Sequence, residues 1–233
     1  MRLAVIPARG GSKRIPRKNI KPFFGKPMIV WSISAAQASG CFDRIVVSTD
    51  DEEIAELARQ YGAEVPFLRP KELSDDFTGT LPVIRHAVLW FEEHEAPVDY
   101  ACCIYATAPF LRAEDIQQGW ETVRSAQCSY AVSATSYAFP IQRAFRLNDD
   151  GRLSMFNPEQ FQTRSQDLEE AYHDAGQFYW GVKQAWLELL PFFGEDTIPV
   201  ILPRHRVQDI DTQEDWQRAE IIFRLAQEEE QGE

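Results

Sequence analysis

The chain has 233 residues, 44% of them hydrophobic and 26% charged, and this ordinary composition favours one sizeable globular domain over a disordered chain. The formal net charge of −12 argues against a general nucleic-acid binder and against a binder of anionic membranes, because both need a basic face. The charge is unevenly distributed: residues 1–42 hold eight of the 24 basic side chains, whereas all 36 acidic side chains lie in the rest. A compact positive region on an acidic protein predicts a small, highly anionic ligand.

Up to Ala134, short apolar runs alternate with amphipathic segments. Gly40 and Gly62 follow two of the amphipathic segments, where a glycine commonly ends a helix, and Asp50 or Asp51 caps the helix between them. The run at 100–105 is almost entirely apolar, as expected for a central strand that is covered on both faces. We expect strands at 3–6, 45–48, 65–68, 100–105 and 130–134, and helices at 27–39, 52–61, 82–94 and 114–126.

The alternation is interrupted between about 138 and 172, where the turn sequence Asn148–Gly151 lies between two short apolar pieces and predicts a hairpin. We expect residues 138–172 to project from the sheet as an insertion that contacts a second copy in a homodimer. Strands return at 176–182 and 200–202, and a helix follows at 214–227. This order predicts an α/β protein: a single domain over 1–233 with a mostly parallel sheet in a Rossmann-like three-layer α/β/α sandwich.

The four cysteines form no C-x-x-C pair, and no histidine lies at metal-ligand spacing from them. We expect Cys41, Cys102, Cys103 and Cys128 to be reduced and mostly buried in a cytoplasmic protein. No stretch approaches the ~18 apolar residues that a membrane span needs, so we expect no membrane partner.

The segment Pro7–Asn19 follows the first expected strand, at the place where α/β proteins carry ligand loops. Gly10 and Gly11 allow the backbone to approach a ligand and to aim N–H groups at phosphate oxygens, and Ser12 adds a hydroxyl. Arg9 can bind phosphate through its planar fork and Lys18 as a point charge. The alternative is a solvated basic loop. The familiar nucleotide motifs, G-x-G-x-x-G and the P-loop, are absent from the sequence.

The run Ala8–Lys13, followed by Ile15-Pro16-x-Lys18-Asn19, resembles the opening motif of the CMP–sugar synthetases. These cytidylyltransferases activate nonulosonic acids such as sialic acid, and their fold is of the nucleotidyltransferase type. In this family the loop binds the triphosphate of CTP, and the position of Asn19 contacts the cytosine. The resemblance implies CTP-binding roles for Ala8, Arg9, Gly10, Gly11, Ser12, Lys18 and Asn19.

The segment Arg69–Thr80 is similar to the family's pyrimidine-binding segment, which implies base contacts for Arg69, Thr78 and Thr80. Chemically, Arg69 offers donors to the cytosine carbonyl, and the threonine hydroxyls can meet the amino edge. Thr78 or Thr80 can also cap the next helix, and the two roles are compatible.

Tyr105–Arg112 lies at the carboxyl end of the central strand, where substrate loops occur. Sialic and legionaminic acid synthetases have Gln-Pro-Thr-Ser-Pro-Leu-Arg there, and Tyr105 replaces that glutamine. Together with His173–Gly181, this version resembles the pseudaminic acid branch. The resemblance implies sugar contacts for Tyr105, Thr107 and Gln177. Arg143 and Arg164 are candidates to bind the sugar carboxylate or the phosphates, across a dimer. Arg164 is the better match to the family, and the alternative is that it is a plain surface arginine.

Asp209 and Asp211 lie two residues apart, so in a strand they would share one face. Two such carboxylates suit Mg²⁺, which otherwise keeps waters or phosphate oxygens, and the family has a matching aspartate pair. The alternative is that Asp211 or Thr212 caps the last helix, since Thr212-x-x-Asp215 resembles a capping box.

The resemblance implies a Mg²⁺-dependent enzyme that transfers CMP from CTP to the anomeric hydroxyl of a nonulosonic acid, with pyrophosphate as the leaving group. Pseudaminic acid is the expected acceptor, and legionaminic and sialic acids are the alternatives. We expect Arg9, Lys18 and Asp211 to carry the catalysis. Three alternative functions remain open: another sugar nucleotidyltransferase, a glycosyltransferase, and a non-catalytic nucleotide-binding subunit.

Overall fold

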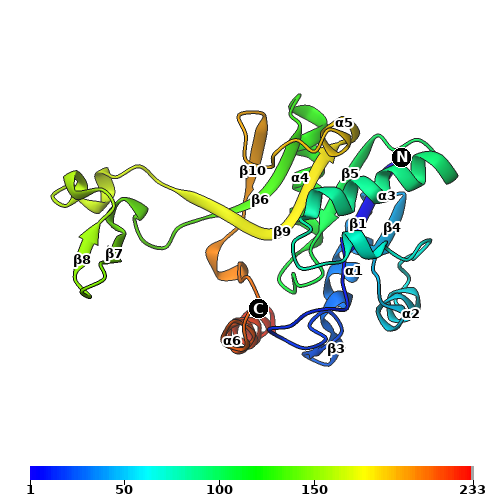
Figure 1. Ribbon diagram of the computed structural model, residues 1–233, viewed down its shortest axis with the longest axis horizontal. Helices are drawn as coiled ribbons and strands as arrows, with labels where there is room; N and C mark the ends of the chain where they lie inside the picture. The colour runs from blue at the N-terminus through cyan, green and yellow to red at the C-terminus, as the bar shows by residue number, and fades with distance from the viewer. Residues whose placement is uncertain (232–233) are drawn as a thin grey trace.

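A computed structural model describes residues 1–231 of the protein. Its centre is a six-stranded sheet in the order β10-β6-β9-β5-β1-β4 (Figure 1). Strand β9 pairs antiparallel with both neighbours, and all other pairs are parallel. The strands are β1 Arg2–Pro7, β4 Arg44–Ser48, β5 Tyr100–Ile104, β6 Tyr130–Ser136, β9 Tyr172–Val182 and β10 Thr197–Ile201. The mostly parallel sheet is therefore confirmed.

Helices cover both faces of the sheet because its central strands are apolar on both sides. In β1, Ala4 and Ile6 pack with α1, α2 and α4, whereas Leu3 and Val5 pack with α3 and α5 on the opposite face. The helices are α1 Met28–Ser39, α2 Glu52–Gln60, α3 Thr80–His94, α4 Ala113–Ser125, α5 Lys183–Leu187 and α6 Gln213–Gln231. The predicted three-layer α/β/α sandwich is thus confirmed.

Helix α6 forms a separate apolar cluster beside the loop that follows β1. Trp216 and Phe223 of α6 pack there with Phe23, whose short strand β2 Pro22–Phe23 pairs with β3 Lys26–Pro27. Ile15, in the middle of the basic segment, is buried in the same cluster. The end of the chain therefore helps to fix the loop near its beginning.

Three expectations need correction. Residues 65–68 do not form the expected strand: a single bridge joins Val46 to Glu64 just before them, and Pro66 has no N–H to donate to a neighbouring strand. Strand β9 begins at Tyr172 rather than 176, and Gly176 lies inside it with a positive φ of 61° where the pairing with β6 shifts register. The stretch 207–211 is irregular and not a strand.

The helix ends follow the expected local chemistry. Gly40 ends α1 in the left-handed conformation, with φ 63°. Of the two aspartates that could cap α2, Asp51 does so, since its Oδ1 accepts from the Ile54 N–H at 3.0 Å. The side chain of Asp50 is therefore left for another partner.

The segment between β6 and β9 projects from the sheet and carries the expected hairpin (Figure 1). Its strands β7 Phe145–Leu147 and β8 Leu153–Met155 pair antiparallel across the turn that contains Gly151. Short 3₁₀ turns occupy Ile141–Arg143, Pro158–Gln160 and Ser165–Asp167. The hairpin is therefore confirmed, and it lies away from the sandwich.

The four cysteines are buried and unpaired, as expected. Within the described residues, none of the helices combines the length and the apolar character that a membrane crossing demands.

Candidate functional site

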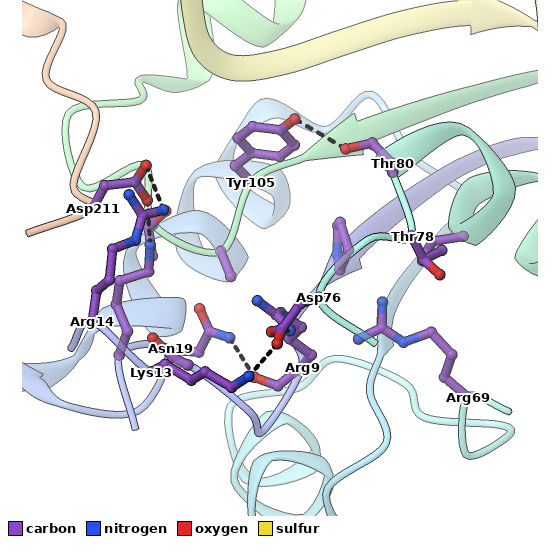
Figure 2. A pocket seen from close by; sticks show the side chains of 17 residues that line it. Arg9, Lys13, Arg14, Asn19, Arg69, Asp76, Thr78, Thr80, Tyr105 and Asp211 are labelled. Atoms are coloured by element: carbon purple, nitrogen blue, oxygen red, sulfur yellow. Dashed lines mark hydrogen bonds and ion pairs between the residues drawn. The ribbon is translucent and has the colours of Figure 1, made fainter. Parts of the chain in front are cut away.

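A cavity of about 490 Å³ opens at the carboxyl ends of β1 and β5, between the basic loop and the segment that precedes α3 (Figure 2). This is the edge at which parallel α/β sheets bind ligands. The predicted site residues that line it are Arg9, Ser12, Lys18, Asn19, Arg69, Thr78, Thr80, Tyr105, Thr107 and Asp211. The fold thus brings together residues from four separate segments of the sequence, within 7–19, 69–80, 105–112 and 207–212.

The loop after β1 is attached to the end of β4 by its backbone. The Ala8 N–H donates to the Ser48 carbonyl at 2.9 Å, and the Gly10 N–H donates to Asp50 Oδ1 at 3.0 Å. A side chain at Gly10 would place its Cβ 2.5 Å from Asp51 Oδ2, so only glycine fits this close approach. Gly11 has no such neighbour and is exposed.

Two further contacts hold the returning part of the loop. Arg17 adopts a positive φ of 55° and binds Asp51 with both terminal nitrogens, at 2.5 and 3.0 Å. Asn19 is buried, and its Nδ2 donates to the Arg9 carbonyl at 3.0 Å. Asn19 therefore closes the base of the loop while lining the cavity, and the loop is held in one shape.

Four cations of this loop surround the cavity, and carboxylates from distant segments pair with each of them. Asp76 binds Arg9 at 2.5 Å and also contacts Lys13. Asp211 binds Arg14 at 2.8 Å and Lys18 at 3.2 Å (Figure 2). The carboxylates are about one-third exposed, and ion pairs so accessible to water are weak, so an anionic ligand can replace them at small cost.

Arg69 lies on the opposite side of the cavity from Asp211 and is 6% exposed (Figure 2). Its Nε and Nη2 have no hydrogen-bond partner, and burial lowers its pKa from the ordinary value. Buried donors of this kind are rarely left unpaired, so the cavity offers them to a ligand carbonyl or other acceptor.

The two threonines lie near Arg69 but do not cap α3 through their side chains. The Thr78 hydroxyl donates to Asp75 Oδ1 at 2.7 Å, and the Thr80 hydroxyl is 3.0 Å from the Tyr105 hydroxyl. The residue at the cap position is Gly79, without a side-chain cap. The capping alternative for Thr78 and Thr80 is therefore wrong.

The four predicted sugar residues are separated in the structure. Tyr105 and Thr107 line the cavity, and burial raises the pKa of Tyr105 to about 12, so its hydroxyl stays protonated at neutral pH. Gln177 lies buried on β9 outside the cavity lining, where its Nε2 donates to the Arg206 carbonyl at 2.6 Å. Arg164 is exposed in the insertion and pairs with Asp167.

The aspartate pair departs from the expectation that both residues share a strand face. Asp211 lines the cavity, whereas Asp209 does not, because 207–211 is irregular. The pKa of Asp209 is raised, first by partial withdrawal of the carboxyl from water and then by the nearby Asp211 charge. Thr212 takes the cap position, since Asp215 Oδ2 accepts from its N–H at 2.8 Å and Thr212 Oγ1 accepts from the Asp215 N–H at 3.2 Å.

The donor chemistry of this pair fits Mg²⁺. The ion takes one or two carboxylates and completes its shell with waters or phosphate oxygens, and a divalent cation would relieve the repulsion that raises the pKa of Asp209. Within the described residues, no group of three or more His, Cys, Asp or Glu side chains could enclose a metal.

Four residues were not predicted from the sequence: Lys13, Arg14 and Asp76, which line the cavity, and Asp50, which binds the loop. Lys13 and Arg14 lie within Pro7–Asn19, and Asp76 lies within Arg69–Thr80. Their position beside predicted binding residues was a signal that could have identified them. Asp50 follows a buried strand at the ligand-binding edge, and this position was the signal for it.

The family model described as "Cytidylyltransferase" matches residues 3–220. The chain is 47% identical over 223 residues to the pseudaminic acid cytidylyltransferase of Campylobacter jejuni, covering 96% of each chain. It is 34% identical over 233 residues to the CMP-N,N'-diacetyllegionaminic acid synthase of Legionella pneumophila, covering 97% of each. A solved CMP:2-keto-3-deoxy-manno-octonic acid synthetase, in complex with CTP, superposes with a TM-score of 0.68 at 17% identity, covering 97% of this chain and 99% of that one; this likeness concerns the fold alone.

The close approach of Gly10 to Asp51 leads to a testable difference between two adjacent glycines. We expect Gly10→Ala to weaken the binding of inorganic tripolyphosphate by about tenfold or more, because the added Cβ forces the loop away from β4. Gly11→Ala, whose Cβ would meet only Arg9 Nη1 at 3.9 Å, should change the affinity by less than about threefold. Titration calorimetry measures both, and equal affinities for the two variants would contradict the geometry.

Proposed function

The chain belongs to the cytidylyltransferase family, and on that premise we propose that it transfers CMP from CTP to the anomeric hydroxyl of a nonulosonic acid, namely pseudaminic acid. The observation that carries the proposal is the cavity, in which a cationic glycine loop faces a buried arginine with unpaired donors. CTP carries a triphosphate and a pyrimidine on one ribose. Its site therefore needs cations for the phosphates and hydrogen-bond donors for the base within one cavity.

In this proposal the loop binds the triphosphate and the opposite wall binds the base. Arg9, Ser12 and Lys18 contact phosphate oxygens. The N–H groups of Ala8 and Gly10 already donate to Ser48 and Asp50, so these two residues shape the loop rather than bind the phosphates through their N–H groups. The Arg69 donors meet the cytosine carbonyl, and Asn19, Thr78 and Thr80 contact the rest of the base.

The chemistry is a direct displacement at the α-phosphorus. The anomeric oxygen forms a bond to phosphorus while the bond to pyrophosphate breaks, so the protein mainly positions the reactants and offsets charge. Arg9 and Lys18 stabilise the negative charge that develops on the leaving pyrophosphate. Bound Mg²⁺ would supply further neutralisation of the phosphate charge, held by Asp211 and Asp209.

The choice of acceptor rests on Tyr105 and on the similarity to the Campylobacter enzyme. The Tyr105 hydroxyl and Thr107 lie on the cavity wall, where they can donate to or accept from a sugar. A glutamine amide at position 105 would offer a different set of donors and acceptors, so the substitution bears directly on specificity.

An assay of pyrophosphate release tests the substrates. We expect turnover with CTP but not with UTP or GTP, and at least a tenfold higher kcat/KM for pseudaminic acid than for legionaminic or sialic acid. Tyr105→Gln should reduce that preference. A preference for sialic acid in the unaltered protein would refute the acceptor, and CTP binding without turnover would favour a non-catalytic subunit. Transfer from a preformed nucleotide sugar would instead indicate a glycosyltransferase.

The proposal also includes the dependence of turnover on Mg²⁺. We expect Asp211→Asn to raise the Mg²⁺ concentration for half-maximal turnover and to lower kcat by about 100-fold, since one carboxylate ligand is lost. Asp209→Asn should raise the same Mg²⁺ concentration. Glu214→Gln, which removes an exposed charge three residues beyond Asp211, is the matched control and should behave like the parent. An unchanged Mg²⁺ titration for Asp211→Asn would remove the metal assignment.

The homodimer is supported by the apolar surface of the insertion, which monomeric proteins rarely leave in contact with water. The exposed side chains are Phe139, Phe145, Leu147, Leu153, Phe156 and Phe161. A second copy would cover them, and Arg164 would then act in the partner's site. The cytoplasmic location expected from the sequence stays a prediction.

The dimer prediction concerns Leu147 and Leu153, which face each other across the hairpin. We expect the unaltered protein to be a dimer, and the double variant Leu147→Glu with Leu153→Glu to be monomeric, because burying two charges is costly. Ile221→Glu, at an exposed position on α6, serves as the control. Light scattering gives the masses, and a monomeric unaltered protein would contradict the proposal.

A further inference from the structure

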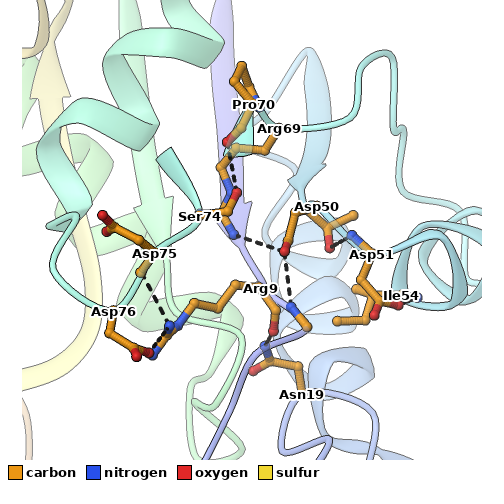
Figure 3. A network of polar contacts seen from close by, with 12 residues as sticks. Arg9, Asn19, Asp50, Asp51, Ile54, Arg69, Pro70, Ser74, Asp75 and Asp76 are labelled. Atoms are coloured by element: carbon orange, nitrogen blue, oxygen red, sulfur yellow. Dashed lines mark hydrogen bonds and ion pairs between the residues drawn. The ribbon is translucent and has the colours of Figure 1, made fainter. Parts of the chain in front are cut away.

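Asp50 and Asp51 lie one residue beyond the end of β4, after Thr49, yet their side chains take different partners (Figure 3). Asp51 caps α2 and binds Arg17, which accounts for its carboxylate. The carboxylate of Asp50 lies instead between the glycine loop and Arg69. Asp50 does not itself line the cavity, so any influence on a ligand acts through these two neighbours.

One oxygen of Asp50 serves both neighbours. Asp50 Oδ1 accepts the Gly10 N–H at 3.0 Å and lies 3.8 Å from Arg69 Nη2. The main chain reinforces the link, since the Arg69 N–H donates to the Thr49 carbonyl at 2.7 Å. The carboxyl end of β4 therefore touches both walls of the cavity.

Arg69 depends on this carboxylate for its charge balance. Burial lowers the pKa of Arg69, and the nearby charge of Arg9 lowers it further, whereas the Asp50 charge acts in the opposite direction. Among the described residues, Asp50 provides the ion pair of Arg69. Without it, the Arg69 guanidinium would be buried near the charge of Arg9 with no carboxylate beside it.

We propose that Asp50 is a positioning residue for nucleotide binding, which holds the phosphate-binding loop through Gly10 and orients the base-binding guanidinium of Arg69. The assignment rests on the proposed function, because it takes Arg69 to contact the cytosine. It predicts that the two contacts of Asp50 affect different parts of the nucleotide.

Two variants separate the contacts. Asp50→Asn retains an oxygen that can accept from Gly10 but removes the charge opposite Arg69, whereas Asp50→Ala removes both. We expect Asp50→Asn to weaken CTP and cytidine binding by about tenfold and to change tripolyphosphate binding by less than about twofold. Asp50→Ala should weaken all three ligands.

Asp43 supplies a matched control at the other end of the same strand. It accepts the Arg2 N–H at 2.7 Å and pairs with the Arg2 guanidinium at 3.0 Å, so it makes the same two kinds of contact outside the cavity. Asp43→Asn should leave the affinities for all three ligands unchanged. Thermal melting of each variant shows whether the fold persists.

The affinities of CTP, cytidine and inorganic tripolyphosphate are measured by titration calorimetry on the full chain. The proposal is overturned if Asp50→Asn binds cytidine like the parent, if it weakens cytidine and tripolyphosphate equally, or if the parent does not bind cytidine. Failure of the proposed function has a different signature: the parent then releases no pyrophosphate from CTP with any nonulosonic acid, and the binding comparison for Asp50 still supports or overturns the positioning role.

Discussion

The contact between Gly10 and the two aspartates just beyond β4, Asp50 and Asp51, is the constraint on which the site depends. The Gly10 N–H donates to Asp50, and the space left by Asp51 admits no side chain at Gly10. The backbone is thereby held against the sheet edge, and the cations of the loop are displayed on the other side, toward the cavity. Because Asp51 is itself fixed by its cap of α2 and by Arg17, the loop has a rigid support. A flexible basic loop would lose conformational entropy whenever it bound an anion, and a supported one loses less.

Electrostatics explain how an acidic protein can present a cationic cavity. The acid-free residues 1–42 place four of their eight basic side chains around the cavity, and Asp76 and Asp211, from distant parts of the chain, pair with these four. These pairs are partly exposed and weak, so they balance charge without blocking a stronger anionic ligand. Arg69 differs because it is buried and has donors without partners. The cavity therefore combines a replaceable set of cations with one desolvated group suited to discriminating between ligands, since an unpaired buried donor penalises a ligand that lacks an acceptor.

The sandwich and the insertion between β6 and β9 differ in how they treat their apolar side chains. The sandwich buries its apolar strands under helices on both faces, and α6 returns to pack beside the basic loop. The insertion has the opposite character, since its large apolar side chains are exposed. Arg164 lies in this insertion and outside the cavity of its own chain, and Gln177 is buried in β9. A sugar pocket that used Arg164 would therefore need a second copy of the chain, whereas Tyr105 and Thr107 are available within one copy.

The sequence by itself determined the order of most elements, the hairpin, the glycine loop and most of the residues that line the cavity. The elements, the hairpin and the glycine loop follow from local rules: apolar periodicity, helix caps such as Gly40, turn residues and a motif within one βα connection. The cavity residues outside that loop, such as Arg69 and Tyr105, were expected from the resemblance of their segments to the CMP–sugar synthetases. Only the tertiary structure decided that Asp51 caps α2 while Asp50 reaches Arg69, because both residues carry the same chemistry and differ only in direction. It also separated Asp209 from the cavity, since 207–211 is irregular and alternation of faces applies only to a strand. Contacts such as Asp76 with Arg9, or Asp211 with Lys18, join residues 67 and 193 positions apart, and packing rather than local pattern sets them.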